Sequence, residues 1–264
     1  MDLEAIVSTM CDTARAAGEF ITNAKHIEVS VKEGHANFVT TMDKASQKLI
    51  TEGLTGVVEG ANFVGEEDAG EHLLKPGYNW IIDPIDGTMN YIKGLCHSSI
   101  SIALVKDHQP VAGVIYNPYI DEMFSAIAGK GAKCNGKEIH ISDASWKNGV
   151  ISFGSTPYDV SRCKNTFKIL SDIAGESGDV RRMASAALDF CYVACGKYDG
   201  FFELQLQVWD YAAGYLIAKE AGAMIHPIDC EKFDYAHPSG FYCANEACGP
   251  HLEQIISKYV KVLK

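Results

Sequence analysis

Two aspartates three residues apart, Asp83 and Asp86, are the residues whose types and spacing point most directly to chemistry. They follow the apolar run from Tyr78 to Ile82, which predicts a buried strand, and Gly87 comes next at a position suited to a tight turn. We expect the turn to lead into a helix whose first amides are free to bind phosphate. Short carboxylates beside such an anion site are ligands that Mg²⁺ prefers. The stretch therefore predicts phosphate chemistry on metal ions.

Two more acids are placed so that they could join Asp83 and Asp86 at a shared site. Glu66 comes soon after the short strand predicted at 62–64, and Asp210 lies in the first turn of a predicted helix. Acids packed against an apolar strand repel one another and are costly to bury unless a cation neutralises them. The four acids together therefore predict a multi-metal centre.

The length and composition favour a folded protein with a small substrate. The chain has 264 residues, of which 47% are hydrophobic, so it can bury a substantial core in one large domain or two closely packed halves. Its formal net charge is -11, and no run of Lys or Arg forms a patch that would hold a nucleic-acid backbone. We expect a small-molecule substrate and no nucleic-acid partner.

The nine cysteines do not predict a disulfide framework, because they are scattered through a long chain that lacks a secretory signal at its start. Residues 1–24 show the pattern of an amphipathic helix. No segment has the uninterrupted apolar length needed to span a bilayer. We expect a soluble, cytoplasmic protein with no membrane partner.

The spacing of apolar residues predicts helices and strands in alternation. Helices are expected over 1–24, 41–57, 162–174, 184–195 and 209–221, and in a final segment carrying Leu252, Ile255, Ile256, Tyr259 and Leu263. Strands are expected over 27–32, 38–40, 62–64, 79–82, 98–105, 110–116, 123–128, 149–153, 179–182, 200–203, 223–226 and 240–244, with a hairpin over 129–141. A polar stretch at 142–148 separates two halves, about 1–141 and 149–264, which we interpret as parts of a single catalytic domain, 1–264.

Several familiar catalytic signatures are absent from the sequence. The segment Gly131–Lys137 has the spacing of a phosphate-binding P-loop, but Glu138 stands where Ser or Thr must hold magnesium, so a hairpin is the better interpretation. The G-x-S-x-G, C-x-x-C and H-E-x-x-H motifs do not occur. Nucleophilic serine chemistry and a zinc site are therefore without support.

The acidic segments resemble the successive signatures of a known family. Gly65-Glu66-Glu67, the stretch from Trp80 to Tyr91, and the stretch from Trp209 to Gly214 look like the motifs of the inositol monophosphatase family, in the same order. The similarity extends from Lys32 to Ala223. It implies a mixed α/β fold of the α+β class, the family's five-layered α-β-α-β-α sandwich, assembled as a homodimer.

The resemblance implies a site for two to three Mg²⁺ ions. Glu66, Asp83 and the backbone carbonyl of Ile85 would hold the first ion. Asp83, Asp86 and Asp210 would hold the second. A third, weaker magnesium would lie near Glu66.

The resemblance also implies how phosphate and water are held. Gly87 and Thr88 would offer backbone amides to the phosphate, and Thr88 with Asp43 would orient or deprotonate the attacking water. Glu66, Thr88 and Asp43 are therefore the expected catalytic residues. In such a mechanism two metals activate the water and stabilise the leaving alkoxide, and no covalent phosphoenzyme is required.

Substrate contacts are expected from the second half of the chain. Glu203 stands where the family accepts hydrogen bonds from ring hydroxyls of inositol, and a solvated strand end is the alternative interpretation. The segment beginning at Ala184 resembles the family's Gly-Thr-Ala, so Ser185 and Ala186, together with Asp210, are expected beside the substrate.

The resemblance implies Mg²⁺-dependent hydrolysis of a phosphate monoester, with myo-inositol 1-phosphate as the expected substrate and lithium as an inhibitor. Alternatives within the superfamily are 3′-phosphoadenosine nucleotides, fructose 1,6-bisphosphate, NADP and histidinol phosphate. Arg182 is an extra cation that would serve a second phosphate or only the surface, and we favour the surface. An alternative of another class is a non-catalytic scaffold for a transcription or membrane partner.

Overall fold

The computed structural model describes residues 1–33, 37–68, 74–156, 159–228, 234–235 and 237–261. Its helices are α1 (Leu3–Thr22), α2 (Thr41–Leu54), α3 (Thr88–Lys93), α4 (Val160–Ala174), α5 (Ala186–Ala194), α6 (Val208–Glu220) and α7 (Gly249–Ile256). Its strands are β1 (Val29–Glu33), β2 (Asn37–Thr40), β3 (Asn62–Gly65), β4 (Tyr78–Asp86), β5 (Ser99–Lys106), β6 (Gln109–Asn117), β7 (Glu122–Ile127), β8 (Ala132–Cys134), β9 (Lys137–Ile139), β10 (Val150–Phe153), β11 (Asp179–Arg181), β12 (Gly200–Leu206), β13 (Met224–Ile228) and β14 (Ser239–Ala244). None of the described helices is both long enough and apolar enough to cross a membrane.

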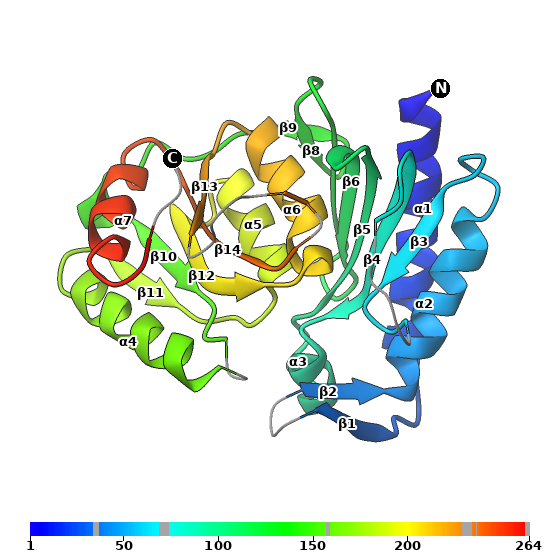
Figure 1. Cartoon of the computed structure of the whole chain (residues 1–264), viewed down its shortest axis with the longest axis horizontal. Coiled ribbons are helices and arrows are strands. Elements are labelled where there is room, and N and C mark those ends of the chain that lie inside the picture. The colour runs from blue at the N-terminus through cyan, green and yellow to red at the C-terminus, as the bar shows by residue number, and fades with distance from the viewer. Residues whose placement is uncertain (34–36, 69–73, 157–158, 229–233, 236, 262–264) are drawn as a thin grey trace.

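The strands form two main sheets that helices cover on both sides. Within the described residues, the seven-stranded sheet has the order β3-β4-β5-β6-β7-β8-β9 and the five-stranded sheet the order β11-β10-β12-β14-β13, while β1 and β2 form a separate pair. Figure 1 shows the layers in succession: α1 with α2, the seven-stranded sheet, α5 with α6, the five-stranded sheet, and α4 with α7. This arrangement confirms the mixed α/β fold class and the five-layered sandwich.

Buried side chains fill the spaces between all five layers. One cluster, which includes Met10 and Trp80, joins α1 and α2 to one face of the seven-stranded sheet. A second cluster, which includes Phe190 and Tyr211, packs α5 and α6 between the two sheets. A third, which includes Ile169, packs α4 and α7 against the outer face of the five-stranded sheet. Because α5 and α6 are enclosed on both sides, they are apolar on nearly every face.

Strand β4 is buried on both faces, as its apolar run predicts. Trp80 and Ile82 belong to the core beneath α1 and α2, whereas Ile81 belongs to the core beneath α5 and α6. The strand continues to Asp86, beyond the end expected at 82, because it stays paired with β5 across a bulge.

The bulge places the two aspartates of β4 on the same face of the sheet. Asp83 pairs with Ser101 and Asp86 with Ser99, so three steps along β4 oppose two along β5. In a regular strand, side chains three positions apart point to opposite faces of the sheet. The extra residue of the bulge turns the second side chain to the same face as the first. Pro84, which has no amide hydrogen to donate, lies within the interruption. Both carboxylates consequently face the layer of α5 and α6.

Two helices end three or more residues earlier than the sequence pattern predicts. Helix α2 stops at Leu54 instead of 57, where Thr55 adopts an extended backbone. Helix α7 stops at Ile256, and the amide of Tyr259 bonds to the Ile256 carbonyl in a three-residue turn that replaces the helical spacing. Tyr259 still packs against the core from this turn. Leu263 lies outside the described residues.

Candidate active site

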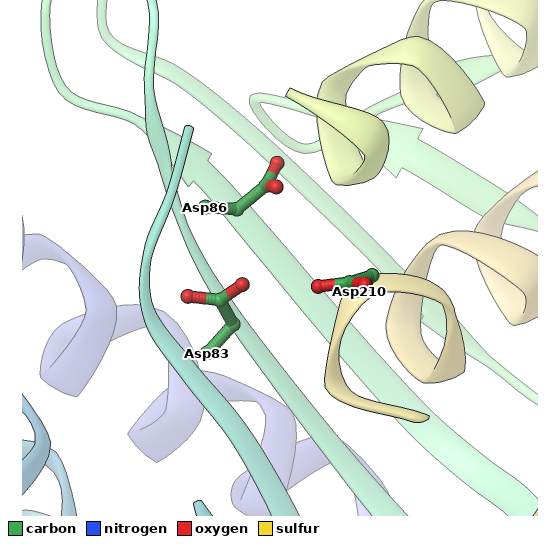
Figure 2. A group of neighbouring side chains, drawn as sticks. All are labelled: Asp83, Asp86 and Asp210. Carbon is green, nitrogen blue, oxygen red and sulfur yellow. The ribbon is translucent and has the colours of Figure 1, made fainter. Parts of the chain in front are cut away.

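Asp83, Asp86 and Asp210 meet where β4 ends and α6 begins. Each offers a carboxylate oxygen, and these atoms all lie within 4.8 Å of one another. Figure 2 shows the three side chains converging from the two elements. They line a cavity of about 160 Å³.

Backbone amides hold one oxygen of Asp83 and one of Asp210. The amide of Ile85 donates to Oδ1 of Asp83 at 3.0 Å. The amide of Gln207 donates to Oδ2 of Asp210 at 2.7 Å, because Asp210 is the third residue of α6 and forms a capping box with Gln207. These bonds fix the orientation of both carboxylates at the edge of the cavity.

The start of α5 holds Asp86. The hydroxyl of Ser185 and the amide of Ala187 both donate to Oδ2 of Asp86, the amide at 3.0 Å, and the hydroxyl of Ser99 lies 3.4 Å from the same oxygen. Ser185, which we expected beside the substrate, lines the cavity together with Ala186, but its buried hydroxyl bonds to Asp86. The sequence carries no signal for this contact, because the two residues are 99 positions apart.

Burial and mutual repulsion raise the pKa of the clustered acids. For Asp83 and Asp210 the loss of solvent is the largest cause, the charges of Glu66 and Asp86 add to it, and the pKa of each lies well above its ordinary value. The pKa of Asp86 is raised less, to about 6, because the hydrogen bonds from α5 favour its charged form. Such a cluster is costly without a cation, and closely spaced carboxylate oxygens are the donors that hard divalent ions prefer. The residues therefore fit a magnesium site.

Glu66 lines the same cavity but lies outside the group of three closely spaced aspartates. The loop that carries it is held by Gln47 from α2. The side chain of Gln47 donates to Asp68 at 2.7 Å and accepts from the amide of Glu67 at 2.9 Å. Asp68 in turn accepts from the amide of Gly65 at 2.7 Å, so it shapes the turn. No pattern in the sequence indicates that Gln47 positions the loop of Glu66.

The structure brings Asp43 and Thr88 together. The hydroxyl of Thr88 lies 3.4 Å from Oδ1 of Asp43 and 3.1 Å from the carbonyl of Ile85, and it can donate to either. Asp43 is fully buried, and its other oxygen accepts from the amide and the hydroxyl of Thr40 in a capping box at the start of α2. The position of Asp43 is therefore set by the helix cap.

Gly87 makes the turn between β4 and α3. Its φ of +88° is one that L side chains rarely adopt, and a Cβ there would lie 2.9 Å from the carbonyl of Ala184. The amides of Gly87 and Thr88 stand at the start of α3, where a helix leaves its first donors without partners inside the helix.

Glu203 reaches the cavity from β12, in the five-stranded sheet. The amide and the hydroxyl of Thr156 lie 3.1 Å and 3.4 Å from its Oε1. A Cβ at Gly154 would lie 1.8 Å from its Oε2, so the glycine leaves room for the carboxylate. Burial raises the pKa of Glu203 to about 7, and the bonds from Thr156 oppose this shift. Glu203 is only 8% exposed, so the alternative of a solvated strand end is wrong.

Two further charged residues, Asp189 and Arg182, line the cavity near Glu203. Asp189 is buried in α5 and accepts from the hydroxyl of Ser152 at 2.7 Å. The one sequence signal for Asp189 is a single acid within the apolar run 186–194, and our reading of the sequence missed it. Arg182 is exposed, as expected of a surface residue, yet it also borders the cavity and donates to Ser155 at 3.1 Å.

A sequence model described as the inositol monophosphatase family matches residues 2–262 of the chain. The chain belongs to this family. It is thus an inositol monophosphatase family phosphomonoesterase, with a candidate metal site at Asp83, Asp86 and Asp210.

Known relatives within the inositol monophosphatase family are similar over most of the chain. The "Nus factor SuhB" of Salmonella typhimurium is 39% identical over 220 residues, which cover 80% of this chain and 81% of the relative. The "Fructose-1,6-bisphosphatase/inositol-1-monophosphatase" of Aquifex aeolicus is 36% identical over 235 residues, covering 88% and 86%. The solved structure of an IMPase from Thermotoga maritima has a TM-score of 0.83 and 30% identity, and 98% of each chain is covered.

Proposed function

We propose that the protein hydrolyses myo-inositol 1-phosphate to myo-inositol and phosphate with Mg²⁺. The observation that carries the proposal is a single cavity with two chemically different sides. Its metal side consists of Glu66, Asp83, Asp86 and Asp210, and its substrate side is built around Glu203. A polyol phosphate has the matching parts, because metal ions bind its phosphate and its hydroxyls donate to a carboxylate.

On the metal side, the three clustered aspartates, Glu66 and the carbonyl of Ile85 would hold two to three Mg²⁺ ions. When bound, these ions lower the pKa of a water molecule and offset the charge of the phosphoryl oxygens. The amides that bind Asp83 and Asp210 keep the ligands in place before the substrate arrives.

Thr88 and Asp43 would orient the attacking water. The Thr88 hydroxyl donates its hydrogen toward Asp43 or toward the Ile85 carbonyl, so its lone pairs are available to accept from water. The amides of Gly87 and Thr88 would bind phosphoryl oxygens, as the first amides of helices do.

On the substrate side, Glu203 would accept hydrogen bonds from ring hydroxyls, and Ser185, Ala186 and Asp210 would border the same ring. Because both halves of the chain line the cavity, and Asp210 of the second half completes the metal side formed by Glu66, Asp83 and Asp86 of the first, we infer that residues 1–264 act as a single catalytic domain.

Phosphate release from a panel of esters in Mg²⁺ tests this function. We expect inositol 1-phosphate to give a higher kcat/KM than fructose 1,6-bisphosphate, 3′-phosphoadenosine nucleotides, NADP and histidinol phosphate. A folded protein that releases no phosphate from inositol 1-phosphate would overturn the proposal.

A bisphosphorylated sugar is the second candidate substrate, and Arg182 is the observation that favours it. Arg182 borders the cavity with its guanidinium on the Glu203 side, where a second phosphate would need a cation. The Aquifex aeolicus relative is named for both activities. A higher kcat/KM for fructose 1,6-bisphosphate than for inositol 1-phosphate in the panel would favour this candidate.

Relatives named Nus factor SuhB favour a separate role as a partner in a transcription complex. For such a scaffold the hydrolysis is incidental. An Asp83→Asn chain that loses phosphatase activity but keeps its full role in the cell would support the scaffold function.

A further inference from the structure

Asp189 is a buried acid on α5 whose surroundings leave one of its oxygens unused. It is 1% exposed, and its amide donates to the carbonyl of Ser185 one helical turn earlier. The hydroxyl of Ser152 donates to Oδ1 at 2.7 Å. Within the described part of the chain, Oδ2 has no hydrogen-bond partner.

An oxygen in this position is open to the cavity. Asp189 lines the same cavity as Glu203, and its Oδ2 is not among the atoms that are both sealed from solvent and unpaired. Nearly all buried polar atoms in proteins find a partner, and an unpaired one costs stability. The unused acceptor of Asp189 is therefore placed for a ligand that enters the cavity.

The charges around Asp189 select the kind of group that fits. Burial is the largest cause that raises the pKa of Asp189; the negative charges of Glu203 and Asp86 add to it, and the charge of Arg182 opposes it. All four side chains line the same cavity. A second anionic group next to Asp189 and Glu203 would be repelled. A hydroxyl is neutral and can both donate and accept, so it pairs with an acid in either protonation state.

We propose that Asp189 is a second substrate-contacting residue, which binds a ring hydroxyl of the polyol through Oδ2 beside the hydroxyl bound by Glu203. The inference rests on the proposed function. Glu203 on β12 and Asp189 on α5 would bind two hydroxyls of the same ring. These two hydrogen bonds would fix the rotation of the ring relative to the phosphate. Figure 1 shows α5 between the two sheets, where it can reach both sides of the cavity.

The experiment compares a substrate that has hydroxyls with one that lacks them. Asp189→Asn keeps the volume of the side chain and an acceptor for Ser152 but replaces the cavity-facing oxygen by an amide NH₂. For inositol 1-phosphate in Mg²⁺ we expect kcat/KM to fall by about 10-fold, mainly through KM, because the amide NH₂ cannot accept the hydrogen bond that a ring hydroxyl donates to Oδ2. For phenyl phosphate we expect a change of less than about threefold, since it has no ring hydroxyl for Asp189 to bind.

Asp199→Asn is the matched control. Asp199 is also a buried acid of the second half, but it bonds to Ser142 and to the amide of Val150 and does not line the cavity. Any loss in this variant should be equal for the two substrates. An equal loss for the two substrates in Asp189→Asn, or no loss for either, would overturn the proposal.

Deoxy analogues of inositol 1-phosphate identify the hydroxyl. The analogue that lacks the hydroxyl bound by Asp189 should be hydrolysed with equal kcat/KM by the wild type and by Asp189→Asn, because the contact is already absent. With the other analogues, kcat/KM of Asp189→Asn should stay below that of the wild type. If every analogue keeps the difference, the proposed contact is wrong.

A structure of the wild type with Mg²⁺, inositol and phosphate gives a test that needs no variant. It should place a ring hydroxyl within about 3.2 Å of Oδ2 of Asp189, and a longer separation would overturn the contact even if the variants fail to fold. The wild-type substrate panel decides the proposed function separately. If another polyol phosphate is preferred there, the comparison with phenyl phosphate is repeated with that ester.

Discussion

The two sides of the cavity differ in how their negative charge is distributed. On the metal side, Asp83, Asp86 and Asp210 crowd oxygens within 4.8 Å, and each aspartate is tied to a backbone amide. On the substrate side, Asp189 is held by the hydroxyl of Ser152 and Glu203 by the amide and the hydroxyl of Thr156, with Arg182 nearby. The metal side concentrates charge for a cation, whereas the substrate side spreads its charge over separate hydrogen-bonding groups.

The two sides also differ in the parts of the fold that hold their carboxylates in place. The metal-side carboxylates are fixed by a bulge in β4, by the capping box of α6 and by the start of α5, all parts of regular elements. The carboxylate of Glu203 depends on the segment after β10, where Gly154 leaves space and Thr156 donates. Substitutions should therefore affect chemistry on the first side and substrate preference on the second.

Asp83→Asn should have the largest effect, because it removes a charge from the metal side. We expect kcat/KM with Mg²⁺ to fall by on the order of 1000-fold or more, since charge stabilisation in the transition state is lost. In EDTA the same variant should melt at a higher temperature than the wild type, because one repelling buried charge is gone. Phosphate release and thermal unfolding measure the two effects, and a variant that is less stable in EDTA would contradict this view of the metal side.

Glu203→Gln should change how stability depends on pH. Burial raises the pKa of Glu203 from 4.5 to about 7, so between these values the folded protein binds more protons than the unfolded chain. The free energy of unfolding of the wild type therefore falls as pH rises through this window. Glutamine does not titrate, so this loss is absent from the variant. Relative to the wild type, the free energy of unfolding of Glu203→Gln should therefore increase by up to about 3 kcal/mol at neutral pH and by nothing at low pH.

Urea unfolding in EDTA, at several values from about pH 4 to 8, measures the difference between Glu203→Gln and the wild type. The other titrating acids are common to both proteins and cancel to first order. A difference that stays constant over the range would show that Glu203 is not a buried acid with a raised pKa.

Gly154→Ala should have the smallest effect and one confined to the substrate side. The added Cβ would lie 1.8 Å from Oε2, so the Glu203 carboxylate must move. We expect kcat/KM for inositol 1-phosphate to fall about tenfold, through KM, with kcat/KM for phenyl phosphate nearly unchanged, because one hydrogen bond to the ring is lost. Gly175→Ala is the matched control, since nothing lies within 4 Å of a Cβ there. Equal kinetic changes for both substrates would remove the distinction between the two sides.

The sequence was sufficient to predict the parts of the site that depend on local pattern. The apolar run of β4 and the acids that follow it, Asp83 and Asp86, are where the pattern places them, and Asp43 is indeed the third residue of a helix. The fold class followed from the same motifs through the resemblance. These features were predictable because strand burial, helix caps and turns act over a few residues.

The remaining parts of the site depend on contacts between distant segments. No local rule predicts that Ser185 bonds to Asp86, or that Gln47 orders the loop of Glu66. The bulge that aligns Asp83 with Asp86 was also missed, because it is a property of the pairing with β5. Tertiary packing decides each of these.

The layer of α5 and α6 has a consequence for synthesis of the protein. Strands β4 to β9 are neighbours in chain order, so this sheet can pair early, but its inner face is covered only when α5 and α6 have been made. About 80 residues separate the end of β9 at Ile139 from the end of α6 at Glu220. At typical translation rates that interval lasts roughly 4 to 16 s, during which apolar residues such as Phe124 lack their native cover. The nascent chain should bind chaperones most strongly in this interval.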